Sequence, residues 1–224
     1  QIQQGLFFPA FRKRIKRMTS QEVSETVARL KREFHSMMNG VASGSMRDKG
    51  LNYGVNFGVE GVRLVEMSHT LPRESALARA LWQQRVRECR LLAPMIYPAE
   101  EFSQDVCDAW IDTLQTTEEV QYLSMYLLQR LPYAGGKVLE WMASENDMRQ
   151  LCGFLVAGRM LGNGVRFYGR ERNELLDQCE TALYCKNSNV ARAAYNALQH
   201  FASQNYYKET EVEKIFSKFA ERNK

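Results

Sequence analysis

The segment ALWQQRVRECRLLAPMIY, residues 80–97, contains the pattern that decides the fold. It opens on the end of one apolar helix, at Trp82, and within four residues enters a second helix that carries arginines. In this second part, apolar side chains recur three and four residues apart, which is the spacing of a helix with one buried face. If the pattern returns along the chain, the fold is an array of helix pairs.

The same layout returns three more times. The second helices begin near Val86, Val120, Met148 and Val190, so that their starts lie 34, 28 and 42 residues apart. Another apolar helix precedes each of them, at residues 75–82, 103–114, 136–143 and 172–184. The chain therefore contains four copies of one helix-pair unit.

Local signals indicate where these helices begin and end. We expect polar residues of the short turns to cap the second helices, namely Thr117, Asn146 and Asn189. Pro132 should stop the helix that starts near Val120, because proline cannot continue a helix. Gly162 and Gly164 are a typical glycine stop. The segment 162–172 could form a short hairpin or a turn, and we favour a loop.

These features predict an all-α fold, an α-α superhelix built as a solenoid of HEAT-like repeats. Regular repeats of that kind run about 40 to 47 residues, and the units here are shorter and less regular. One pair cannot bury its apolar stripe alone, so neighbouring pairs stack. We expect a single curved domain over residues 1–224, with a basic N-terminal helix or arm at 1–20 and a C-terminal helix at 208–224.

Composition excludes several classes of protein. Hydrophobic residues make up 45% and charged residues 25% of the chain, and the net charge is +4, as in an ordinary globular protein. No apolar run reaches the roughly 20 residues of a membrane span. At the N-terminus an apolar stretch precedes a basic one, which is the reverse of a secretory signal. We therefore expect a cytoplasmic protein without a membrane partner.

The cysteines and histidines do not form a recognisable metal or disulfide pattern. The chain has an odd number of cysteines, Cys89, Cys107, Cys152, Cys179 and Cys185. Most stand among apolar residues, which favours reduced thiols in the core. The three histidines are scattered and match no ligand spacing. We expect neither a metal nor a cofactor.

Two segments of this chain resemble a known family. The match is carried by YGVNFGVEGVRLVEM and ALARALWQQRVRECRLLAPMIY, and its residues are Gly58, Val59, Arg63, Leu81, Trp82, Glu88 and Ala93. They are similar to the DNA alkylation repair enzymes, the alkylpurine DNA glycosylases built from HEAT-like repeats. The resemblance covers roughly residues 20–205. It implies a concave surface that holds duplex DNA through its backbone.

The resemblance also implies a set of catalytic groups. Excision of a cationic alkylpurine passes through an oxocarbenium-like transition state, which a carboxylate stabilises. An aromatic face adds a cation–π contribution, and an arginine holds the phosphate. In the family these groups form a Trp-Asp-x-x-Asp motif at the start of one second helix, with an arginine in the next unit.

This chain departs from the motif at three positions. Thr117 replaces the tryptophan, Gln121 the final aspartate and Leu151 the arginine. A neutral amide cannot stabilise a cation as a carboxylate does. The chain therefore looks like a divergent member without the catalytic motif. Glu118 keeps an acid in the motif and is the candidate substitute, although an acid in the first turn also complements the helix dipole.

Trp141 and Glu145 share one helical face and are an alternative pair for the chemistry. We favour the interpretation that Trp141, like Trp82, is a core residue between neighbouring units.

Arginines near the second helices are the candidate DNA contacts. They are Arg149, Arg159, Arg166, Arg170 and Arg192. If stacking brings them to one wall, they would neutralise phosphates without reading bases. The alternative is that they are solvated charges interspersed with acids.

Three functions remain open. The first is a DNA-binding protein related to the glycosylases, which binds duplex, distorted or branched DNA without base excision. The second is an active glycosylase with rearranged residues. The third is a protein-interaction scaffold. We expect DNA as the partner, through backbone contacts, and a monomer.

Overall fold

The protein is all-helical in the computed structural model, which describes residues 17–204 and 210–222. Within these ranges the helices are α1 (Ser20–Ser36), α2 (Gly40–Asp48), α3 (Gly61–Thr70), α4 (Ser75–Trp82), α5 (Arg87–Ile96), α6 (Gln104–Asp112), α7 (Thr117–Tyr126), α8 (Ala134–Met142), α9 (Asp147–Gly162), α10 (Gly169–Ala182), α11 (Ser188–Ala202) and α12 (Thr210–Arg222). Two short 3-10 helices, Ala99–Glu101 and Leu128–Arg130, lie between them. None of the helices in these ranges combines the length and the apolar character needed to cross a membrane.

The four predicted units are the pairs α4–α5, α6–α7, α8–α9 and α10–α11. This confirms the all-α solenoid. α12 occupies most of the expected C-terminal helix. Most of the expected N-terminal helix or arm, residues 1–16, lies outside the described residues.

The caps follow the sequence analysis only in part. Asn146 caps α9 by accepting the backbone N–H groups of Met148 and Arg149, as expected. Thr117 and Asn189 were the wrong choices. Thr116 caps α7, and Asn187 caps α11. Each true cap stands one or two residues earlier, where the backbone is still extended and the side chain can reach the free N–H groups of the first turn.

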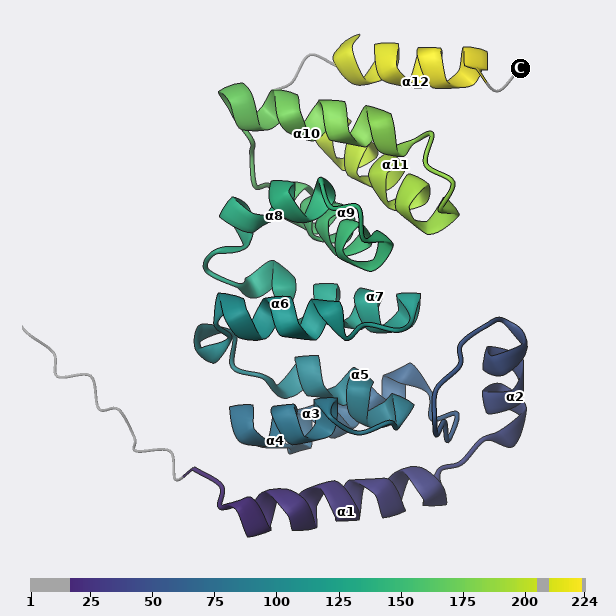
Figure 1. Ribbon diagram of the computed structural model, residues 1–224, viewed down its shortest axis with the longest axis vertical. Helices are drawn as coiled ribbons and strands as arrows, with labels where there is room; N and C mark the ends of the chain where they lie inside the picture. The colour runs from purple at the N-terminus through teal and green to yellow at the C-terminus, as the bar shows by residue number, and fades with distance from the viewer. Residues whose placement is uncertain (1–16, 205–209, 223–224) are drawn as a thin grey trace, which may run out of the picture.

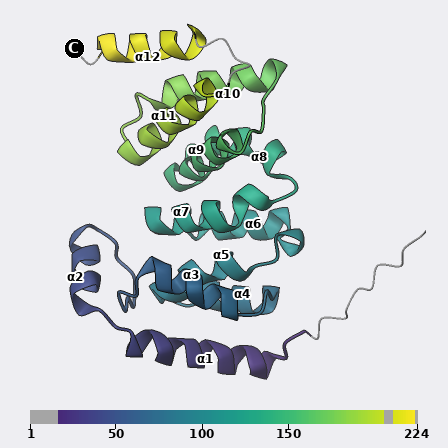
Figure 2. The same ribbon diagram turned by 180° about the vertical axis from the view of Figure 1, so that it is seen from behind.

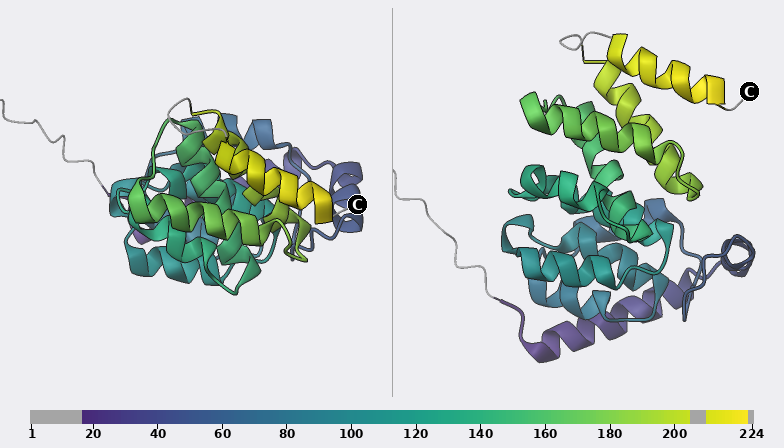
Figure 3. Two further views of the ribbon diagram at one scale, coloured as in Figure 1. Left: turned by 90° about the horizontal axis from the view of Figure 1, so that it is seen from above. Right: turned by 45° about the horizontal axis from the view of Figure 1, so that its top comes forward.

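The pairs stack along the long axis of the molecule, with α1 at one end and α12 at the other (Figure 1). Successive layers are turned relative to one another about this axis (Figure 3). Seen from behind, α9 and α11 lie nearer the viewer than α8 and α10 (Figure 2). The second helices α5, α7, α9 and α11 each contact the next, whereas the first helices approach one another less closely. The stack is therefore tighter on its second-helix side, as expected of the inner layer of a solenoid.

The antiparallel pairs give the stack two edges. The turns 83–86, 113–116, 143–146 and 183–187 lie along one of them, which we call the turn edge. The connections 71–74, 97–103, 127–133 and 163–168 lie along the other, the linker edge. The turn edge is on the right in Figure 1, where α2 stands off the stack beside it. Second helices therefore begin at the turn edge and end toward the linker edge.

Tryptophans fill the interfaces between units. The rings of Trp82 in α4 and Trp110 in α6 are stacked 4.1 Å apart and parallel within 1°. Trp141 in α8 is fully buried. The expectation that Trp82 and Trp141 belong to the core is confirmed, and Trp141 is excluded as a groove residue.

The cysteines are free thiols, as expected. Burial raises the pKa of Cys89, Cys107, Cys152 and Cys179 to about 12. Cys185 is only partly buried. The four buried thiols stay protonated at neutral pH, so they are packing residues and not nucleophiles.

Trp141→Ala should lower the free energy of unfolding by about 3–5 kcal/mol, because it leaves a large cavity between α8 and α9. Urea unfolding followed by circular dichroism measures the change. Tyr168→Ala is the control, since that side chain is 65% exposed, and it should change the stability by less than about 0.5 kcal/mol. Equal effects of the two substitutions would contradict the assignment of Trp141 to the core.

Candidate nucleic-acid interface

The segment before α3 is fastened to α5 by a buried carboxylate. Glu88 is fully buried and accepts hydrogen bonds from the backbone N–H groups of Phe57 (3.3 Å) and Val59 (3.2 Å). Between them, Gly58 has φ of +73°, and the Asn39 carbonyl leaves no room for a Cβ there. Gly58, Val59 and Glu88, which carry the family resemblance, are therefore one structural unit.

Arg87 joins this unit to α7. Its side chain is 2% exposed, and its Nε and Nη2 donate to the two oxygens of Glu118 at 2.9 and 2.6 Å. Nη1 donates to the Val59 carbonyl at 2.9 Å and to Glu88 at 3.2 Å. Burial alone lowers the pKa of Arg87, but Glu118 and Glu88 outweigh it and raise that pKa. The guanidinium is permanently charged and fully occupied.

Glu118, the candidate substitute acid, is therefore already bound. Besides Arg87, it accepts a hydrogen bond from the Tyr53 hydroxyl at 2.9 Å. Burial and the negative charge of Glu118 raise the pKa of Tyr53, so this phenol stays protonated and donating. A carboxylate with both oxygens satisfied by a guanidinium has little remaining charge for a developing cation.

A second ion pair repeats the connection between α5 and α7. Arg90 donates to both oxygens of Glu119 at 2.9 Å, and Glu119 also accepts the Gln115 N–H at 2.9 Å. The Arg90 guanidinium stands 3.9 Å from the centre of the Trp82 ring, a cation–π contact. Both acids of the first turn of α7 thus fix the register between two units, in addition to lying at a helix N-terminus.

The three positions that the resemblance assigns to the family motif lie in α7 and α9. Thr117 is the first residue of α7 and is half-buried. Gln121 follows one turn later and is exposed. Leu151 is only 3% exposed in α9. No aromatic ring, carboxylate or guanidinium occupies these three positions.

A cleft of about 490 Å³ opens at the turn edge beside the two ion pairs. Its walls include Tyr53, Gln83, Arg85, Arg90 and Gln115. Arg90 is neutralised by Glu119, so the cleft adds one exposed cation, Arg85, to the turn edge.

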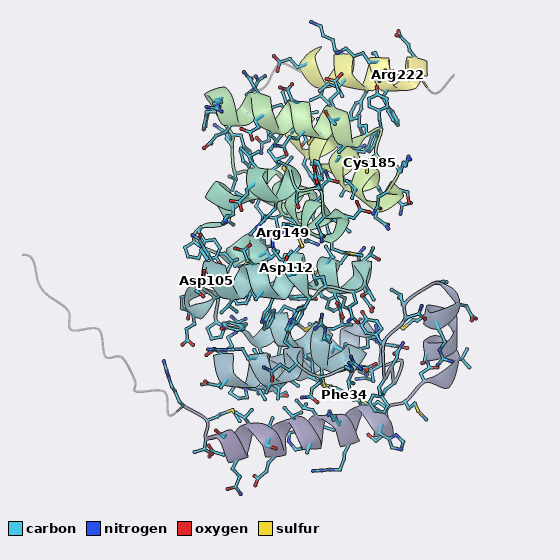
Figure 4. All side chains as sticks on the ribbon, viewed as in Figure 1. Phe34, Asp105, Asp112, Arg149, Cys185 and Arg222 are labelled. Atoms are coloured by element: carbon cyan, nitrogen blue, oxygen red, sulfur yellow. The ribbon has the colours of Figure 1, made fainter. Side chains whose placement is uncertain are left out.

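Arg149 does not stand free on the second-helix side. Its Nη1 and Nη2 donate to Asp108 and Asp112 of α6, each at 2.7 Å (Figure 4). α6 is the first helix of the preceding unit, so the guanidinium is directed between two units and toward the first-helix layer. The acidic partners raise the pKa of Arg149 despite the opposing effect of burial.

The other four candidate arginines divide between the two edges. Arg159 in the last turn of α9, Arg166 in the following connection and Arg170 at the start of α10 lie toward the linker edge. Arg192, near the start of α11, lies toward the turn edge and is exposed. The five arginines therefore do not lie along one edge of the stack, because α9 and α11 begin at the opposite edge from where they end.

Two further arginines at the linker edge were not among the candidates. Arg73 lies before α4 and Arg130 after α7, and both are exposed. Burial lowers the pKa of Arg130, and the charge of Arg73 lowers it further. Neither forms a salt bridge with any described residue. Two guanidinium groups that repel one another offer a site for an anion. Pro72 and Pro132 stand close to these two arginines in the sequence and mark the connections between helices. This is the sequence signal that could have identified them as edge residues.

The described part of the chain contains no group of three or more His, Cys, Asp or Glu side chains arranged to hold a metal ion.

The fold defines an all-helical protein built from stacked HEAT-like helix pairs. A family model described as DNA alkylation repair enzyme matches residues 16–217, and the chain belongs to that family. No curated protein matches the sequence.

One solved structure has the same fold. It is described as "A new family of proteins related to the HEAT-like repeat DNA glycosylases with affinity for branched DNA structures". The TM-score is 0.74 at 16% sequence identity, and the match covers 87% of this chain and 82% of the other. At this identity the similarity extends to the fold alone.

Arg87→Met should lower the free energy of unfolding by about 3–5 kcal/mol, because Glu88 would remain buried without its guanidinium. The matched control is Arg85→Met, two residues away and exposed, which should cost less than about 0.5 kcal/mol. Denaturant unfolding of both variants measures the difference. A loss for Arg87→Met no greater than that of the control would show that the ion network does not hold the first two units together.

Proposed function

We propose that this protein binds DNA without sequence preference, in duplex, distorted or branched form, and does not excise alkylated bases. Family membership supports DNA as the partner. The relative with the same fold is described as having affinity for branched DNA, which favours that form of substrate here.

The state of Glu118 is the observation that carries the second half of the proposal. Its carboxylate is bound by Arg87 and Tyr53, and position 121, one turn on, carries a neutral amide. A developing oxocarbenium ion would find no unpaired carboxylate at either position, and carboxylate stabilisation is the main contribution that such chemistry needs. Leu151, which is buried, cannot supply the phosphate contact of the missing arginine.

For DNA contact we propose the arginines without acidic partners toward the linker edge. Arg73, Arg130, Arg159 and Arg170 form no salt bridge with the residues that the structure describes. Arg192, which is exposed and lies toward the turn edge, is a further candidate outside this set. Backbone contacts of this kind are independent of sequence and release counterions from DNA, so they weaken as salt rises.

DNA that carries 3-methyladenine or 7-methylguanine should keep its bases when incubated with the protein. Abasic sites, scored by strand cleavage, should not exceed those of a buffer control, because the motif positions lack the required groups. Glu118→Gln should leave the number of abasic sites unchanged, and thermal melting shows whether the variant, which weakens the pairing of buried Arg87, is still folded. Excision that Glu118→Gln abolishes would identify Glu118 as a working substitute acid and would favour the active glycosylase.

Binding to duplex DNA should weaken steeply with salt. The double variant Arg130→Gln, Arg159→Gln should flatten the plot of log affinity against log salt by about 2, since each neutralised phosphate contributes about 0.9. Fluorescence anisotropy over a salt series provides both slopes.

The control double variant removes the same charge from arginines that have acidic partners. Arg29 pairs with Glu33 in α1, and Arg149 pairs with the aspartates of α6. Arg29→Gln with Arg149→Gln should leave the slope within about 0.5 of the unmodified protein. An equal flattening in both double variants would mean that net charge, and not the linker edge, determines binding.

A further inference from the structure

Two tyrosines of α7 form an open aromatic surface beyond the position of the lost carboxylate. The rings of Tyr122 and Tyr126 lie 5.6 Å apart at 42°, and both side chains are only half-buried. Met125, on the same helix, is 37% exposed. Tyr122 lies against Gly61 at the start of α3, so close that a Cβ at Gly61 would collide with its hydroxyl. The surface therefore lies where α3 and α7 meet.

A guanidinium without an acidic partner borders this surface. Arg159 lies in the last turn of α9, which packs against α7, and Tyr126 is the neighbour whose phenol acts on it electrostatically. Its Nε is buried and has no hydrogen-bond partner among the described residues. Arg130, which is exposed and forms no salt bridge with the described residues, follows Tyr126 by four residues. The site thus combines two half-buried tyrosine rings with a guanidinium that forms no salt bridge with the described residues.

These groups match the chemistry of one ligand class. A flat ring stacks on tyrosine faces, and a phosphate provides the acceptors and the negative charge that Arg159 lacks. A nucleotide carries both parts. In an intact duplex the base faces are covered by neighbouring bases, so only an unpaired nucleotide presents a free face.

We propose that Tyr122, Tyr126 and Arg159 bind one unpaired DNA nucleotide, with its base on the tyrosine rings and its phosphate on the guanidinium. This inference rests on the proposed DNA binding and deepens it, because it names the feature of distorted or branched DNA that the protein recognises. An unpaired nucleotide is present at a bulge, a flap and an open junction. Backbone contacts at the linker edge hold the duplex arms, and the tyrosine site selects the position.

The experiment compares two DNA molecules of equal sequence, a perfect duplex and the same duplex with one extra unpaired 2-aminopurine. Anisotropy of an end label measures affinity, and 2-aminopurine emission reports stacking. The full chain should bind the bulged DNA about tenfold more tightly, within the range of one base–aromatic stacking contact. The emission should fall on binding.

Single substitutions distinguish the contribution of the tyrosine ring from that of the arginine charge. Tyr126→Leu should remove most of the preference for bulged DNA and leave duplex affinity within about twofold. Tyr126→Phe keeps the ring and should keep the preference. Arg159→Gln should flatten the salt dependence on bulged DNA by about 0.7 to 0.9.

The matched control is Tyr184→Leu. Tyr184 is 38% exposed and also belongs to a tilted aromatic pair, with Phe219, but lies at the other edge of the stack. Tyr184→Leu should leave the affinities for the perfect duplex and for the bulged DNA unchanged. Thermal melting of each variant identifies any that fails to fold, and Tyr122→Leu then replaces Tyr126→Leu.

The outcomes distinguish the two proposals. Salt-sensitive binding of both DNAs with equal affinity would overturn the tyrosine site and leave the DNA-binding function standing. If both Tyr122→Leu and Tyr126→Leu kept the preference for bulged DNA, the tyrosine site would again be overturned and the DNA-binding function would stand. No binding of either DNA at micromolar concentration would overturn the proposed function, and the site with it.

Discussion

The buried guanidinium of Arg87 is the constraint on which the first half of the molecule depends. Removal of a charged group from water is costly unless every donor finds an acceptor. Arg87 meets this condition through one carbonyl and two carboxylates, which come from three separate segments: the connection before α3, α5 itself and α7. Val59 and Glu118 cannot shift relative to each other without exposing this charge. The network therefore sets the position of the surface formed by α3 and α7.

The same network gives Glu118 a structural role. Its two oxygens stabilise the junction between two units. A carboxylate that pairs with a buried arginine is tied to that role, because its release would leave the guanidinium uncompensated. Gln121, one turn further along α7, is neutral, and Leu151 in α9 is buried. What remains on this side of the solenoid is a scaffold with cations at its edge and aromatic rings between them.

The helices could be predicted from the sequence because their apolar residues recur with a fixed period, and each predicted pair was found. The burial of Trp82 and Trp141 followed from the same stripe. The partners of the arginines could not be predicted. Glu118 is 31 residues from Arg87, and Asp108 is 41 residues from Arg149. Periodicity indicates which face a residue occupies, but not which acid from another unit meets it. Arg73 and Arg130 could not be predicted either, because they lie in connections between helices, where the sequence has no hydrophobic periodicity.

The ion triad of Arg149 also acts on whatever approaches the protein. One guanidinium is shared by two aspartates, so the group carries a net charge of about −1 and lies on α6, in the first-helix layer. Close to this triad a negatively charged ligand meets repulsion, whereas the arginines of the linker edge attract it. The charge is therefore unevenly distributed over the array. If the ligand is DNA, this local asymmetry favours one orientation of a rod of negative charge without recognition of a base.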